Sequence, residues 1–326
     1  YVMSVVLDKG FSLISIPLVA RYLSPQEFGR LEAVSSVIEI AGLLLAFGAA
    51  ETLVRFASDA RAGAERRSIV AQLLGTSLVL VLVLGSAIQC AAPLLSAATG
   101  VKVGETAFRL GLLAATVTAL IEMPLVWLRL NERTSAFLCF IGVRSCVQVL
   151  ATWLVLAAGW GADGVLISNG LAVLAFALLL TSLQARETGV TFGMKGVRTI
   201  LRYGVPLVGA GLSMFALGSL SRLFLAWHVS DAEVAYFGLA LKIALIAPLF
   251  HQPFALWWNP RRIQVLYGPD GLKRSADAWG VGVAILVLGS MTVALGAPVL
   301  IHLALPASYA MSAVFVAPLV LVCVLN

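Results

Sequence analysis

The chain alternates between long apolar stretches and short polar or glycine-rich breaks along nearly its whole length. A bilayer core has no water to satisfy backbone groups, so a stretch of about 20 apolar residues crosses it as a helix. The pattern therefore predicts an all-α, polytopic membrane protein with about ten helices. Their expected ranges are 1–22, 31–56, 68–97, 105–130, 135–158, 162–184, 203–228, 233–258, 277–303 and a last segment that begins near 309.

Composition agrees with this pattern, because 60% of the residues are hydrophobic and only 12% are charged. Soluble domains of this size carry about 25% charged residues, so a soluble fold is excluded. The four cysteines lie in apolar stretches without CxxC spacing, and the three histidines form no ligand pattern. We expect no disulfide framework, no metal site and no cofactor. We also interpret the chain as part of a longer protein, since both ends lie in apolar stretches.

An internal repeat relates the two parts of the chain at a shift of 206 positions. The shift places SPQEFGRL (24–31) over SDAEVAYF (230–237), and each segment begins with the S-x-x-E capping box that starts a helix. A shift that spans six helices keeps their orientation, which predicts parallel repeats about an axis along the membrane normal. We expect an N-terminal six-helix bundle over 1–190 and an incomplete C-terminal bundle over 200–326. Chance recurrence of a short capping motif is the alternative.

Basic residues in the loops predict how the chain is oriented. Fourteen lie in or near alternate loops on one side, against four on the other, which is a strong positive-inside bias. The first helix should therefore run outward from the cytoplasm, with the basic loops cytoplasmic. The fourteen are Arg55, Arg61, Arg66, Arg67, Arg129, Arg133, Arg186, Lys195, Arg198, Arg202, Arg261, Arg262, Lys273 and Arg274.

Four cations lie inside predicted helices, where each costs about 2.5–3.5 kcal/mol on insertion scales and so usually has a function. They are Arg222, Lys242, Arg144 and Lys9. Each must meet water, a carboxylate or an anionic ligand. Lys9 lies next to Asp8, so a local ion pair is an alternative to ligand contact. Lys242 and Arg144 have the alternative of structural pairs with Glu39 and Glu122.

Small and polar residues share a helix face with most of these charges, at i, i+3 and i+4 spacing. We expect such faces to contact other helices or a water-filled cavity. Asp8, Glu39 and Glu122 are candidates for coupling to an ion gradient. The predicted faces are Gly211, Phe215, Gly218 and Arg222; Arg144, Gln148 and Thr152; Ser4, Asp8, Ser12 and Ser15; Ser35, Glu39 and Gly42; Thr118 and Glu122; and Ala235, Gly238 and Lys242.

Known enzyme motifs are absent from the sequence. It contains no GK[ST] phosphate loop, no HExxH and no nucleophile elbow, and its loops are too short for a catalytic domain. We therefore expect the protein not to be an enzyme. An ion gradient is the expected energy source.

Four segments carry a resemblance to a known family: IPLVARYLSPQEFGRLEAV (16–34), GAAETLVRF (48–56), YGVPLVGAGLSMFALGSLSRLFL (203–225) and VAYFGLALKI (234–243). With them the chain resembles the polysaccharide (O-antigen type) lipid-linked oligosaccharide flippases of the multidrug/oligosaccharidyl-lipid/polysaccharide exporter superfamily. Many relatives carry Asp just before the late arginine of the seventh helix, where this chain has Ser221. That departure puts an adjacent counter-ion for Arg222 in doubt.

The resemblance implies alternating-access transport of an undecaprenyl-pyrophosphate-linked oligosaccharide across the bacterial cytoplasmic (inner) membrane. The implied partners are this lipid-linked substrate, the bilayer and a polysaccharide polymerase or export machinery, with no nucleic acid. A guanidinium binds phosphate oxygens bidentately, so Arg222, Lys242, Arg144 and Lys9 are the expected head-group ligands.

Two alternatives remain open. One is a multidrug cation antiporter of the same superfamily, which would need an acidic, aromatic pocket. The other is a membrane-embedded glycosyltransferase or polymerase, which usually shows a catalytic acidic loop or a large outer loop.

Overall fold

The computed structural model describes residues 2–46, 48–60, 63–100, 103–218, 220–258 and 261–325. This part of the chain is helical and contains no strand, which confirms the all-α prediction. The elements are α1 (Val2–Tyr22), α2 (Pro25–Ala46), α3 (Ala49–Asp59), α4 (Ala64–Thr99), α5 (Glu105–Val117), α6 (Ala119–Leu130), α7 (Thr134–Ala157), α8 (Gly161–Thr188), α9 (Met194–Gly218), α10 (Leu220–Ala226), α11 (Asp231–Ala244), α12 (Ala247–Trp258), α13 (Arg262–Leu266), α14 (Gly271–Ala304), the 3₁₀ turn η1 (Ala307–Tyr309) and α15 (Ser312–Leu325).

Both predicted capping boxes are present and set the starts of α2 and α11. The backbone N–H of Glu27 donates to Ser24 Oγ at 3.3 Å, and the N–H of Ser24 donates to Glu27 Oε2 at 3.1 Å. Ser230 and Glu233 make the same reciprocal bonds at 3.4 and 2.9 Å. Because the cap lies ahead of the apolar stretch, α2 begins at Pro25, earlier than the predicted residue 31.

Several predicted helices are interrupted. The range 31–56 divides into α2 and α3 at Gly48, which has a left-handed backbone with φ of +56°. A Cβ at Gly48 would lie 3.1 Å from the Cα of Gly204 and from Leu207 Cδ1, so α9 packs closely against this break. Glycine alone accepts both the positive φ and the close approach. The breaks between α5 and α6 and between α11 and α12 are milder, since Thr118 and Leu245 keep right-handed helical dihedrals.

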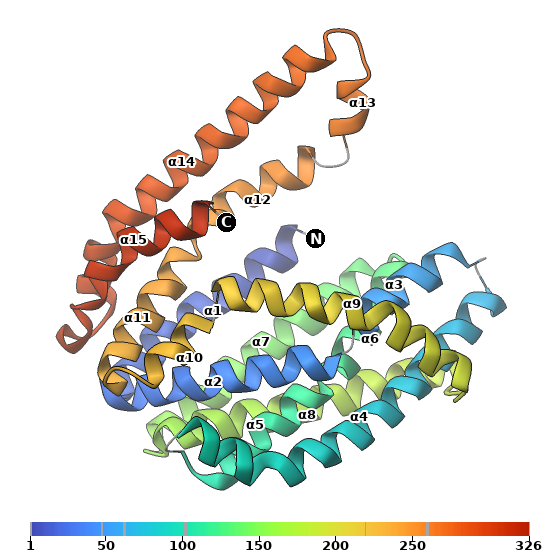
Figure 1. The fold of residues 1–326 in the computed structure, drawn as a ribbon, viewed down its shortest axis with the longest axis horizontal. Coiled ribbons are helices and arrows are strands. Elements are labelled where there is room, and N and C mark those ends of the chain that lie inside the picture. Colours follow the sequence, from blue (N-terminus) through green and yellow to red (C-terminus); the bar gives the residue numbers. More distant parts are fainter. Residues whose placement is uncertain are drawn as a thin grey trace.

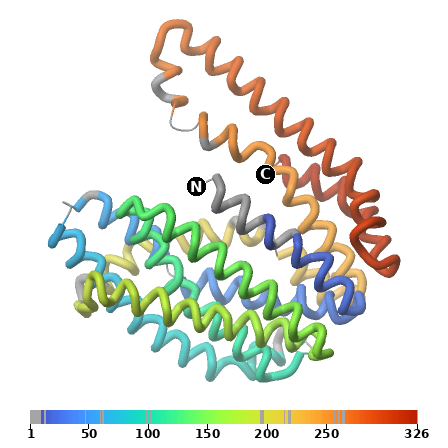
Figure 2. Tube along the Cα trace, turned by 180° about the vertical axis from the view of Figure 1, so that it is seen from behind, coloured from blue at the N-terminus to red at the C-terminus, as the bar shows by residue number. Residues whose placement is uncertain are grey.

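The helices α1–α8 form one bundle, and α9 lies along it beside α2, α3 and α4 (Figure 1). The helix α11 packs mainly against α2, and α15 packs against α11 and α14. From there α12 and α14 diverge from the bundle (Figures 1 and 2). The helices therefore lie together at one end of the molecule and apart at the other, which we call the spread end. Seven helical segments of the described chain are long and apolar enough to span a bilayer, which supports a multi-pass membrane protein.

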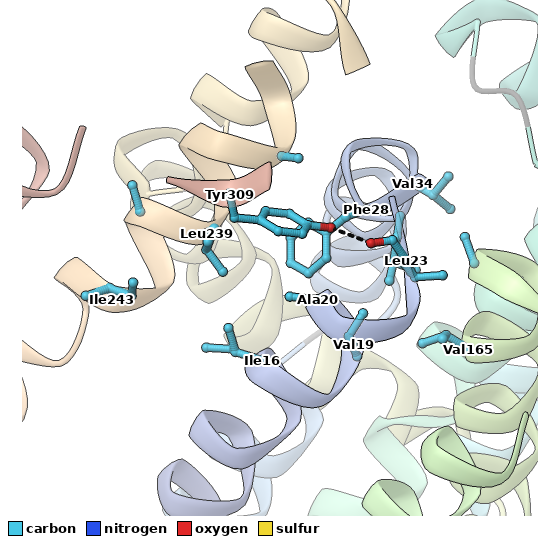
Figure 3. Close-up of a cluster of buried hydrophobic side chains, with 14 of the residues drawn as sticks. Ile16, Val19, Ala20, Leu23, Phe28, Val34, Val165, Leu239, Ile243 and Tyr309 are labelled. Carbon is cyan, nitrogen blue, oxygen red and sulfur yellow. Dashed lines mark hydrogen bonds between the residues drawn. The ribbon is translucent and has the colours of Figure 1, made fainter. Parts of the chain in front are cut away.

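The joined end is held by a buried apolar cluster from α1, α2, α8, α11 and η1 (Figure 3). The hydroxyl of Tyr309 donates to the carbonyl of Leu23 at 2.9 Å, and its ring meets Phe28 edge-to-face at 5.7 Å. Burial raises the pKa of the Tyr309 hydroxyl, which further favours the protonated form that donates this bond. Arg30 and Asp231 add an ion pair of 2.9 Å between α2 and the start of α11. We call the region of these contacts, which are made by Leu23, Phe28, Arg30, Asp231 and Tyr309, the joined end.

Candidate functional site

A group of four charges, of which Glu32 and Arg222 are buried, joins α2 to α10 and α11. Arg222 Nη1 donates to Glu32 Oε2 at 2.9 Å, and Nη2 donates to Glu39 Oε2 at 3.0 Å. The other oxygen of Glu32 accepts from the ammonium of Lys242. Glu32 is only 1% exposed, so its carboxylate depends on these two cations for its stability. We call these four residues the charge cluster.

A glycine on α11 leaves room for the charge cluster between α11 and α2. Gly238 on α11 faces Glu32, and a Cβ at this glycine would lie 3.0 Å from Glu32 Cγ and Oε2. Lys242 follows one turn later on the same face and also lies over the ring of Phe28, 5.3 Å from its centroid. The predicted face of Ala235, Gly238 and Lys242 therefore packs against α2.

The partners of these cations differ from those expected from the sequence. Lys242 was expected to have Glu39 or Glu122 as its structural alternative, but it binds Glu32. Arg222 has no acidic residue within four positions, yet two carboxylates from α2 bind it. Glu32 was not predicted, although it lies seven residues before Glu39 and thus shares its helix face.

A cavity of about 440 Å³ lies beside the charge cluster, between α1, α2, α7, α8 and α11. Lys242 and Glu32 form its charged wall, and 37% of the Lys242 side chain is exposed. Four more predicted face residues also line it, namely Ser15, Ser35, Gln148 and Thr152. We call this space the first cavity. It presents one ammonium and several neutral polar groups to any ligand.

A second cavity, of about 720 Å³, lies within the bundle and is covered by α9. Ser35, Leu166 and Asn169 line both cavities, so the two spaces are neighbours. The predicted faces of α2, α5–α6 and α9 meet at this second cavity, which explains their small and polar residues. They contribute Ser35, Glu39, Gly42, Thr118, Glu122 and Gly211, and Glu51 adds a further carboxylate.

Other predicted residues lie elsewhere. Arg144 on α7 lines neither cavity and forms no ion pair with another described residue, although its charge acts on Glu122. The alternative of an ion pair between Arg144 and Glu122 or Glu39 is therefore not found among the described residues. Asp8 and Lys9 belong to α1, but their side chains lie outside the described residues. The described residues also hold no group of three or more metal-ligating side chains.

The comparisons agree with a transporter architecture. A family model described as "Polysaccharide biosynthesis protein" matches residues 1–261. In the comparison with curated proteins, none matches this sequence.

Solved structures of transporters resemble the fold at low sequence identity. An inward-facing multidrug resistance MATE family transporter of the MOP superfamily is 16% identical, with 98% of this chain and 76% of that chain covered and a TM-score of 0.69. A MATE structure in the straight conformation gives 16% identity, 98% and 75% coverage and a TM-score of 0.62. A MOP superfamily transporter from Pyrococcus furiosus gives 15% identity, 98% and 76% coverage and a TM-score of 0.55. At such identity the likeness shows the fold alone.

Proposed function

The chain belongs to the polysaccharide biosynthesis protein family, and on this premise we propose that it is a flippase for a polyprenyl-pyrophosphate-linked oligosaccharide. Family membership is the observation that carries the proposal. The first cavity supports it, because it lies between helices of the bundle and α11 and the ammonium of Lys242 lines it. A diphosphate needs a cationic partner, and Lys242 can supply it.

Lys242 is the head-group ligand that the geometry favours. Its ammonium has three donors, of which Glu32 takes one, and its partly exposed side chain lines the first cavity. Arg222 has a different position, since its side chain is 8% exposed and bound to two carboxylates. In this state Arg222 is a positioning residue that holds Glu32. It would contact a head group only after those ion pairs open.

The shape supports an inward-facing state of an alternating-access cycle. The spread end carries the basic segments around 63–67, 129–133, 186–202 and 261–274, which the positive-inside rule assigns to the cytoplasm. The joined end would then face outward. In this orientation, in the bacterial inner membrane, a lipid-linked substrate would enter from the cytoplasmic leaflet.

Replacement of Lys242 tests this role. We expect Lys242→Ala to reduce surface polysaccharide at least tenfold in a bacterial strain that lacks its own flippase and depends on this chain. Arg262→Ala, which removes an exposed cation at the spread end, is the matched control and should complement like wild type. Equal complementation by both variants, at equal protein levels, would contradict the assignment of Lys242.

The second cavity favours one other function, the export of a lipophilic cation. Glu39, Glu51 and Glu122 line it among apolar side chains, but the described lining includes no aromatic ring. The described lining is thus acidic but not aromatic, whereas the drug pocket of a cation antiporter would need both properties. A growth assay with tetraphenylphosphonium separates the two functions. The flippase proposal predicts no protection by this chain, whereas protection that Glu51→Gln abolishes would favour cation export.

A further inference from the structure

The first cavity is polar without being strongly charged. Its only charged side chains among the described residues are Lys242 and Glu32, which bind each other. Neutral polar side chains from four helices make up much of the remaining wall. They are Ser15, Ser35, Ser145, Gln148, Thr152 and Asn169.

Part of this hydrogen-bonding capacity is not used within the described chain. Thr152 Oγ1 donates to Asn169 Oδ1 at 3.5 Å, which is long for a hydroxyl donor. The side chains of Ser35, Ser145 and Gln148 make no hydrogen bond to another described residue. Polar groups inside proteins are normally paired, so these groups are available to water or to a ligand. Hydroxyl and amide groups both donate and accept, which distinguishes them from a site built for an anion.

From this lining we propose that the first cavity binds a neutral sugar unit of the transported glycan, next to the diphosphate contacted by Lys242. The inference rests on the proposed flippase function and assigns Gln148, Thr152 and Asn169 as sugar ligands. Sugar hydroxyls donate and accept hydrogen bonds as these side chains do.

The apolar part of the wall fits the same ligand. Phe11, Ile16 and Val149 can pack against the C–H faces of a pyranose ring. The volume of about 440 Å³ lies in the range of small-molecule sites, roughly 300–1,000 Å³. The cavity therefore has room for a short glycan segment and not for a whole oligosaccharide.

The test compares binding of two kinds of lipid to the purified full chain in nanodiscs. One probe is undecaprenyl pyrophosphate, and the others are the same lipid carrying N-acetylglucosamine, galactose or rhamnose. Wild type should bind at least one sugar-bearing probe about tenfold more tightly than the bare lipid, the value of one well-made hydrogen bond. Gln148→Leu and Thr152→Val should each remove this preference and leave affinity for the bare lipid unchanged.

Gln252→Leu is the matched control, because Gln252 is exposed on α12 and lines neither cavity. Thr152→Val keeps side-chain shape, so it remains informative where Gln148→Leu fails to fold. If wild type binds the bare lipid and all sugar-bearing probes equally, the sugar site is wrong while the flippase proposal stands. If wild type binds none of these lipids, the flippase proposal and the sugar site fall together.

Discussion

At the scale of single residues, Glu32 is the residue on which the stability of the charge cluster depends most. It is buried and serves both Arg222 and Lys242, so its loss leaves two cations without their shared partner. Breaking a buried ion pair by removing one partner costs about 3–5 kcal/mol. We expect Glu32→Gln, which keeps the side-chain shape, to lower the free energy of unfolding by about this amount. Reversible denaturation in one detergent measures it.

Glu39 provides the comparison for that measurement. It binds the same arginine, but 47% of its side chain is exposed, and exposed ion pairs contribute about 0–1 kcal/mol. Glu39→Gln should therefore destabilise the protein much less than Glu32→Gln. Equal losses for the two variants would show that the charge cluster is not organised around the buried carboxylate.

At the scale of elements, the contact between α2 and α11 depends on a close backbone approach at Gly29. A Cβ there would lie 1.6 Å from the carbonyl oxygen of Asp231, which no side-chain rearrangement relieves. Gly29→Ala must push the two helices apart, and overpacking of this kind costs about 1–3 kcal/mol. We expect a lower thermal unfolding midpoint for this variant.

Gly142→Ala on α7 is the matched control for that change. A Cβ at Gly142 meets nothing within 4 Å, and in a helix interior alanine is more stable than glycine by about 1 kcal/mol. This variant should be as stable as wild type or slightly more so. A Gly29→Ala protein that unfolds like the Gly142→Ala protein would disprove the close packing of α2 on α11.

Most helices and both capping boxes could be predicted from the sequence, because apolar length and S-x-x-E spacing are local signals. The interruption at Gly48 could not, since it reflects the approach of α9 at Gly204. The helix faces at Ser35, Gln148 and Thr118 could also be predicted, and these residues line the cavities. The ion pairs were not, because Arg222 and Glu32 lie 190 positions apart and only the fold brings them together.

At the scale of the whole molecule, transport by alternating access requires the joined end to separate. The ion pair of Arg30 with Asp231 crosses this end at 2.9 Å. We expect Arg30→Cys with Asp231→Cys, in a background without the four native cysteines, to lose transport when a short reducible bis-thiosulfonate linker joins them. Reduction should restore transport, because the cross-link leaves the cavities intact.

Single-cysteine variants treated with the same linker are the control, and they should transport normally. Full activity of the cross-linked protein would mean that the joined end does not open during transport. It would also contradict the assignment of this structure to an inward-facing state.

Reconstitution of the purified protein in vesicles tests the account most directly. A fluorescent glycan linked to undecaprenyl pyrophosphate is placed in one leaflet, and its arrival in the other is followed with an impermeant quencher. We predict movement that depends on the protein and falls at least tenfold with Lys242→Ala. Movement no faster than in protein-free vesicles, with wild-type protein that is folded and correctly inserted, would contradict the central claim.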